Sequence, residues 1–107
     1  SLMKDQIYYK ILDFGKIIGG FIVKPEGKGQ YELYRLFIDP EYQGKGIGSR
    51  TLTYIEKELI DAVKIVLETP SFNIKNHVFY EKMGYIKTGE VKYAEDCYSY
   101  KYEKLLK

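Results

Sequence analysis

The first third of the chain alternates between short apolar runs and turn-forming residues. Asp13–Lys16, which contains Gly15, separates the first two runs, and Pro25–Gly29 separates the second from the third. Runs of this length, rich in β-branched and aromatic residues, predict strands, and a short Gly-containing loop between two of them predicts a hairpin. We therefore expect strands over residues 6–12, 17–23 and 31–38.

The middle of the chain changes to a helical period. Leu52, Ile55, Leu59 and Val63 recur at three- or four-residue spacing with charged residues between them, which predicts an amphipathic helix over residues 46–61. A strand, a short helix that Gly84 ends in a left-handed cap and two final strands are expected after it. These elements cover residues 64–68, 75–83, 85–93 and 98–105.

The order of these elements predicts the topology. A helix between two strands is the right-handed crossover unit, so the third and fourth strands should be parallel neighbours. The expected fold class is therefore α/β (α+β), with a mixed, mostly antiparallel sheet, one long helix and one short helix. The 107 residues allow a single domain. Ser1 and Leu2 precede Met3 and are interpreted as residues outside the natural chain.

Composition narrows the function classes. The net charge is +2 with Lys and Glu interspersed, so no clustered basic excess indicates a nucleic-acid partner. Cys97 is the only cysteine, which excludes an internal disulfide and provides no zinc set, so no metal is expected. No apolar run approaches the roughly 20 residues of a membrane-spanning helix, and no leader is evident, so a cytoplasmic location without membrane association is expected.

Gln43–Gly48 (QGKGIG) gives the strongest chemical signal. It joins a strand to the amphipathic helix, and alternating glycines let a backbone approach a ligand closely. Amides of a first helical turn have no intrahelical acceptor, and the helix dipole adds positive charge there. The segment predicts a socket for a phosphate or pyrophosphate. A tight turn that only caps the helix is the structural alternative.

Two other nucleotide-binding motifs fit this loop less well. A P-loop needs Ser or Thr after Gly-Lys, and Gly46 follows Lys45 here. The Rossmann fingerprint requires Gly-x-Gly-x-x-Gly directly after a strand, whereas the spacing here is Gly-x-Gly-x-Gly. Glu68 does lie twenty positions after Gly48, where that fold places an acidic residue, so this alternative stays open as the weaker fit.

Two segments resemble the signature motifs of the GNAT superfamily of N-acetyltransferases. Residues 38–48 (IDPEYQGKGIG) match a hydrophobic strand end, Asp-Pro and then Gln/Arg-x-x-Gly-x-Gly/Ala. Residues 73–85 (NIKNHVFYEKMGY) match Asn-x-x-Ala-x-x-Phe-Tyr-Glu-Lys-x-Gly-Phe, with Asn76 at the small position and Tyr85 in place of Phe. Members of this family begin with one more strand and two helices, so the resemblance implies a GNAT-like domain truncated at its amino end.

The resemblance implies transfer of an acetyl group from acetyl-coenzyme A to a primary amine of a small molecule, peptide or protein. Amides of the loop would bind the pyrophosphate, the preceding strand would pair with the pantetheine arm, and the amide of Ile38 would polarise the thioester carbonyl. Tyr80 would protonate the departing thiolate. The cofactor-binding residues implied are Leu36, Phe37, Ile38, Gln43, Gly44, Lys45, Gly46, Ile47, Gly48, Ser49, Asn73, Asn76 and Tyr80.

A general base must also be found, because only a neutral amine attacks. Glu32 lies eleven residues before Gln43, where many members of the family place a base glutamate, and a solvent-facing glutamate is the alternative. Tyr80 taken alone would be a core tyrosine. We expect His77 to be a surface or packing residue and Cys97 to be a small buried one. The alternating Tyr98, Tyr100 and Tyr102 are expected to serve core packing or an interface rather than base stacking.

Two other function classes remain open. One is a non-catalytic acyl-coenzyme A sensor or interaction module, and the other is a small nucleic-acid-binding domain that uses Lys and Tyr side chains. Without the amino-terminal elements, apolar sheet surface should be uncovered, and such surface usually marks an interface. A homodimer through the Tyr-rich last strand or an exchanged edge is therefore expected.

Overall fold

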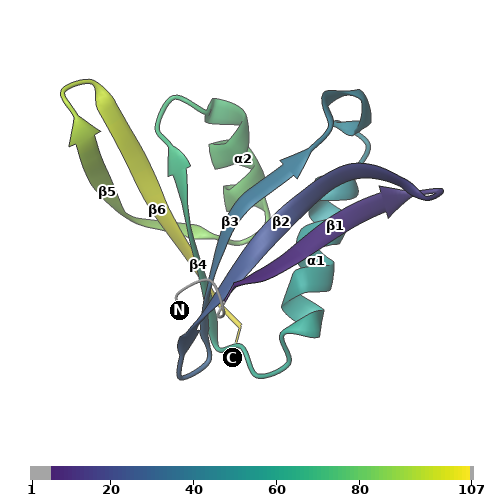
Figure 1. Ribbon diagram of the computed structural model, residues 1–107. Helices are drawn as coiled ribbons and strands as arrows, with labels where there is room; N and C mark the ends of the chain where they lie inside the picture. The colour runs from purple at the N-terminus through teal and green to yellow at the C-terminus, as the bar shows by residue number, and fades with distance from the viewer. Residues whose placement is uncertain (1–5, 107) are drawn as a thin grey trace.

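The computed structural model describes residues 6–106, with the side chains in that range except those of Tyr34 and Arg35. The interpretation of Ser1 and Leu2 lies outside the described residues. Figure 1 shows one twisted sheet with helices beside it, and each predicted helix and strand is present. The elements are β1 (Ile7–Asp13), β2 (Lys16–Gly27), β3 (Gln30–Ile38), η2 (Pro40–Tyr42), α1 (Ile47–Glu58), β4 (Lys64–Pro70), α2 (Ile74–Lys82), β5 (Ile86–Ala94) and β6 (Cys97–Leu105).

The sheet has the strand order β1-β2-β3-β4-β6-β5. The early hairpin of β1 and β2 is antiparallel, as predicted, and so are the pairs β2–β3, β4–β6 and β5–β6. β3 and β4 are parallel neighbours, which confirms the prediction from the crossover helix. The mixed, mostly antiparallel sheet confirms the expected fold class and excludes the Rossmann alternative, because that fold is built on a mostly parallel sheet.

β3 and β4 pair over only part of their length. Their register runs from Gln30 opposite Lys64 to Leu33 opposite Leu67, four residue pairs in all. Beyond that point the two strands diverge, and Figure 1 shows the gap widening toward the end of the sheet where α2 lies. The sheet therefore consists of two three-stranded halves joined by a short parallel seam.

The core lies between the sheet and the two α-helices. Leu52 and Ile55 of α1 are almost completely buried and belong to one cluster with Leu33 of β3 and Tyr80 of α2. Burial alternates along β4, where Ile65, Leu67 and Thr69 are buried and the residues between them are half-buried. This period of two means that one face of β4 meets the helices. The opposite face is not covered by a helix of the described chain (Figure 1).

Two element boundaries differ from the sequence-based expectation by three or more residues. β2 continues through Pro25, which was expected to end it, because the register shifts between Pro25 and Gly27, and such a bulge tolerates a residue without an N–H donor. α1 ends at Glu58 rather than 61, since Leu59 leaves helical geometry at the C-cap. Val63 therefore lies outside the helix and is 41% exposed.

The second helix ends as predicted. Gly84 has φ +97°, the left-handed geometry that glycine adopts without strain. Lys104 of β6 donates from Nζ to the carbonyl of Met83 at 2.9 Å and to Glu56 of α1 at 3.0 Å. Tyr85 donates its hydroxyl to the same carboxylate at 3.1 Å. These bonds tie the end of α2 to α1 and β6.

Exposed apolar side chains are present at the hairpin of β1 and β2. Leu12 and Ile17 are more than half exposed there, and Phe14 is fully exposed. The helix-free face carries charged residues such as Glu32 and Glu68. None of the helices within residues 6–106 combines the length and apolarity needed to cross a membrane.

Candidate active site

A hollow lies where β3 separates from β4. It has a volume of about 680 Å³ and is open to solvent on one side. The end of β3, the loop that enters α1 and one side of α2 form its walls. Eleven residues predicted from the sequence line it: Leu36, Phe37, Ile38, Gln43, Gly44, Gly46, Gly48, Ser49, Asn73, Asn76 and Tyr80.

The predicted and observed linings differ at a few positions. The contacts predicted for Lys45 and Ile47 are made by their backbone amides, and neither residue is among those that line the hollow. The Lys45 ammonium instead lies 5.6 Å from the centre of the Tyr42 ring. The prediction missed four lining residues, Tyr42, Lys75, Phe79 and Lys82. All four lie within the two motifs, at positions between the residues that were named. Including every residue of both motifs would have identified them.

The loop that enters α1 is shaped by its glycines. Gly44 and Gly46 have φ of +78° and +79°, a conformation that is strained for residues with a Cβ. Gly46 is the N-cap of α1 and provides no side-chain cap. The amides of the first turn therefore stay available for an external acceptor, and the helix dipole favours an anionic one.

Hydrogen bonds fix this loop against the end of β3. The Asp39 carboxylate accepts from the amide of Glu41 at 3.0 Å and starts η2. Gln43 donates from Nε2 to the carbonyl of Ile38 at 2.8 Å. The amide of Asp39 donates to the Ile18 carbonyl of β2 at 2.7 Å. Because bonding alternates along an antiparallel pair, the N–H of the preceding residue, Ile38, points away from β2 toward the gap.

The opposite wall of the hollow is the start of α2. Asn73 caps this helix by accepting from the amide of Asn76 at 3.2 Å. The side chain of Asn76 donates to Thr69 of β4 at 3.1 Å. Both asparagines therefore have structural partners while they line the hollow, and their bonds hold the first turn of α2 against β4.

Tyr80 is the buried tyrosine of this wall. Its side chain is 7% exposed, and its ring contacts those of Phe79, Tyr85 and Tyr102. Burial raises the pKa of Tyr80 to about 12, so its hydroxyl stays protonated at neutral pH. No bond to this hydroxyl is formed among the described residues, and none of their buried side-chain polar atoms is without a partner. The hydroxyl must therefore be at the accessible surface of the hollow.

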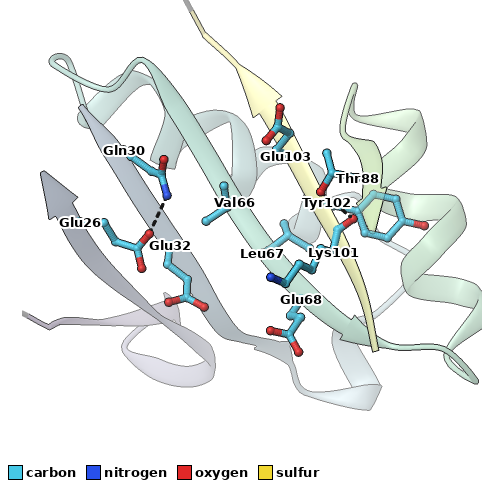
Figure 2. Close-up of a pocket in the computed structure, with 10 residues that line it drawn as sticks. All are labelled: Glu26, Gln30, Glu32, Val66, Leu67, Glu68, Thr88, Lys101, Tyr102 and Glu103. Carbon is cyan, nitrogen blue, oxygen red and sulfur yellow. Dashed lines mark hydrogen bonds between the residues drawn. The ribbon is translucent and has the colours of Figure 1, made fainter. Parts of the chain in front are cut away.

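Glu32 is not in this hollow. It lies on the helix-free face of the sheet, in a smaller hollow of about 310 Å³ (Figure 2). Burial, and then the neighbouring Glu26 through charge and a hydrogen bond, raise the pKa of Glu32, while Lys24 opposes the change. Glu68 faces the same hollow from β4. Both carboxylates lie beside Leu33 and Leu67, where the strands begin to separate.

The remaining candidates from the sequence, His77, Cys97 and the alternating tyrosines of β6, lie outside the hollow between β3 and β4. His77 is 7% exposed and is a packing residue. Cys97 was expected to be buried, but it is exposed, since it opens β6 directly after a turn. Tyr102 is buried and Tyr100 is half-buried, so the tyrosines do not form an exposed platform for base stacking. The described part of the chain contains no cluster of His, Cys, Asp or Glu that could hold a metal ion.

Comparison with known proteins agrees with the two motifs. A family model described as an acetyltransferase (GNAT) domain matches residues 4–87. No curated protein matches the chain by sequence. Among solved structures, an aminoglycoside 6'-N-acetyltransferase complexed with coenzyme A superposes with a TM-score of 0.83 and 21% identity, over 98% of this chain and 76% of its own.

Two further solved structures have the same fold. A GNAT family acetyltransferase from Elizabethkingia anophelis with acetyl-coenzyme A bound gives a TM-score of 0.84 at 18% identity, over 97% of this chain and 78% of its own. The ribosomal-protein-S18-alanine N-acetyltransferase from Escherichia coli gives a TM-score of 0.84 at 18% identity, over 96% of this chain and 70% of its own.

Proposed function

Because the chain belongs to the GNAT acetyltransferase family, we propose that it transfers an acetyl group from acetyl-coenzyme A to a primary amine. The amine attacks directly in a ternary complex. The observation that carries this proposal is the hollow at the gap between β3 and β4. The glycine loop and Tyr80 both line it. Its volume of about 680 Å³ lies in the range of ordinary ligand sites.

Coenzyme A has chemical groups that complement this hollow. The first-turn amides of α1 and the loop before it bind the pyrophosphate, because they lack intrahelical partners and lie at the positive end of the helix dipole. The pantetheine arm is peptide-like and pairs with the free edge of β3 at Leu36–Ile38, as an added strand would. The N–H of Ile38, which points toward the gap, then donates to the thioester carbonyl.

Tyr80 contributes a hydrogen bond to the departing thiolate. A tyrosine with a pKa of about 12 is a weaker acid than a thiol, whose pKa is about 8.5. Complete proton transfer from Tyr80 would therefore be uphill by about 5 kcal/mol. The hydroxyl stabilises the negative charge that develops on sulfur, and the final proton comes from solvent or from the released amine proton.

The acceptor amine approaches from the helix-free face, where Glu32 is the proposed general base. Glu32 lies six residues before Ile38 on the extended strand β3, roughly 20 Å away, so the amine proton reaches it through a path of water molecules and not by direct contact. Its raised pKa makes it a stronger base than a solvated glutamate. The carboxylates of Glu26 and Glu68 line the same hollow, so the acceptor should bind first as a positively charged ammonium and then lose a proton. Similar structures act on an aminoglycoside or on the alanine of a ribosomal protein, so both small amines and peptide amino termini are candidate acceptors.

Thiol release from acetyl-coenzyme A tests the proposal. We expect turnover with at least one member of a panel of aminoglycosides, polyamines and peptides with a free amino terminus. Binding of acetyl-coenzyme A without thiol release for any of these amines would instead support the non-catalytic sensor.

Cofactor binding is tested separately with Gly46→Val. A side chain at Gly46 would meet no atom within 4 Å, but it would be held at φ +79°, where non-glycine residues are strained. We expect the rise in melting temperature produced by coenzyme A to disappear in this variant. Gly15→Val is the matched control, because Gly15 has φ +83°, equally open surroundings and no place in the hollow. An equal loss in both variants, or in neither, would contradict the proposed site.

A further inference from the structure

Tyr93 of β5 reaches across β6 to a residue of β4. Its hydroxyl donates to Oε1 of Glu68, although β6 lies between β5 and β4 in the sheet. The register of β5 on β6 shifts between Lys92 and Ala94, so Tyr93 between them has no directly opposed residue on β6. Tyr93 is therefore the extra residue of a β-bulge, an irregularity that changes the direction of a side chain and is frequent beside active sites.

The bond to Glu68, and not core packing, sets the position of the Tyr93 side chain. Tyr93 is 61% exposed, so its surroundings leave it other directions. The hydrogen bond to Glu68 is the main cause that raises the pKa of Tyr93 above that of an ordinary tyrosine. The phenol therefore stays protonated at neutral pH and is the donor in this bond.

Glu68 lies on the helix-free face at the point where β3 and β4 separate. Leu67, the residue before it, forms the last pair with β3, at Leu33. Leu67 faces the helices, so the pleat of β4 turns Glu68 to the other side, where it lines the smaller hollow together with Glu32 (Figure 2). After burial and Glu26, the charge of Glu68 adds to the causes that raise the pKa of Glu32. Glu68 is thus part of the electrostatic surroundings of the proposed base.

A cation lies directly opposite Glu68 on the neighbouring strand. The register pairs Glu68 with Lys101 of β6, and Lys101 lines the same hollow. Opposed residues of opposite charge attract one another across a sheet, and on this face Lys64 of β4 pairs with Glu103 of β6 at 3.5 Å. The Lys101 ammonium, however, forms no ion pair with another residue of the described chain. Glu68 bonds to Tyr93 instead.

We propose that Tyr93 is a positioning residue that holds the Glu68 carboxylate away from Lys101, so that Glu68 stays available to a positively charged acceptor. This inference rests on the proposed function, in which the acceptor binds as an ammonium on the helix-free face. Without the phenolic hydroxyl, Lys101 and Glu68 form the cross-strand ion pair, and the acceptor loses an attractive charge. The hairpin of β5 and β6 thereby sets the affinity for the acceptor, although none of its residues lines the cofactor hollow.

Acceptor kinetics test this role. With the panel amine that gives the greatest thiol release, Tyr93→Phe should raise KM about two- to fivefold, which is the effect of one exposed ion pair. The value of kcat should not change, because the lost attraction acts on the bound acceptor and the transition state alike. Tyr98→Phe is the matched control. Tyr98 is a partly exposed tyrosine of the same hairpin whose ring lies near Lys92, and this variant should keep the wild-type KM.

Removal of the competing cation distinguishes positioning from a general loss of structure. In a Lys101→Met background, Glu68 has no cation opposite it, so the further change Tyr93→Phe should no longer raise KM. A loss of structure would raise KM in both backgrounds alike. An equal rise in both backgrounds, or no rise in either while the wild-type protein turns over, would overturn the proposed role of Tyr93.

Carbon NMR of protein labelled with [ζ-¹³C]tyrosine tests the bond itself without turnover. The signal of Tyr93 is the one that disappears in Tyr93→Phe. Its pKa should fall in Glu68→Gln, because the negative acceptor that raises it is removed, and an unchanged pKa would overturn the inference. Absence of thiol release with every amine would overturn the proposed function together with the acceptor part of this inference. The tyrosine titration would still decide whether Tyr93 holds Glu68.

Discussion

Tyr80→Phe is the sharpest test of the proposed chemistry. The change removes one hydroxyl from a buried side chain whose ring contacts three other aromatic rings, so the packing volume is kept. A hydrogen bond to a charged group contributes about 1.5–3 kcal/mol. If the bond forms only as the thiolate leaves, kcat and kcat/KM should both fall by about 10- to 150-fold, with little change in coenzyme A affinity.

Stopped-flow thiol release under single-turnover conditions measures the chemical step directly. Tyr85→Phe is the matched control, because Tyr85 is also a buried tyrosine, but its hydroxyl is bonded to Glu56 and it does not line the hollow. The control should lose about 0.5–1.5 kcal/mol of stability and keep its rate, whereas Tyr80→Phe should keep its stability and lose rate. A chemical step within twofold of the wild-type value in Tyr80→Phe would remove Tyr80 from the mechanism.

Three further predictions follow from the described contacts. Glu32→Gln should abolish the general-base limb of the pH–rate profile. The same change should raise the melting temperature at pH 7. The pKa of Glu32 is raised in the folded protein, so its carboxyl favours folding below the unfolded-state pKa and loses this contribution as pH rises through the folded-state pKa. The gain in melting temperature from Glu32→Gln should therefore vanish in acid. Leu52→Ala should lower the free energy of unfolding by about 2–5 kcal/mol in denaturant titrations, because Leu52 is completely buried. Light scattering should show a homodimer at micromolar concentration, and Phe14→Ser at the exposed β1–β2 hairpin should shift it toward monomer.

Local signals were sufficient for most of the fold. The helical period from Leu52 to Leu59 and the turn residues around Gly15 determine elements whose contacts lie near each other in the chain. The prediction was wrong at Pro25, where pairing with β3 and a bulge outweigh the tendency of proline to end a strand. It was wrong at Cys97 because exposure depends on which side of β6 is covered, and the sequence does not specify this.

The candidate site was predictable where the motif residues are contiguous and not where the fold brings distant residues together. The loop after β3 and the start of α2 were both identified from their motifs, and the structure places them on one hollow. The bond between Tyr93 and Glu68 joins residues on different elements with no shared motif, and each alone is typical of a surface residue. The position of Glu32 on the opposite face follows from the pleat of β3, which a spacing to Gln43 does not reveal.

The short seam between β3 and β4 also has a consequence for how the molecule folds and opens. Most neighbouring strands in each half are joined by tight turns, so their pairing closes small loops, whereas the seam joins strands separated by the whole of α1. Contacts between distant parts of a chain form late and set the folding rate. Native-state hydrogen exchange should therefore resolve two cooperative units, with those amides of Gln30–Leu33 that bond to β4 exchanging when the halves part. A molecule that bridges the gap would slow this exchange on both sides at once and make the two units unfold as one.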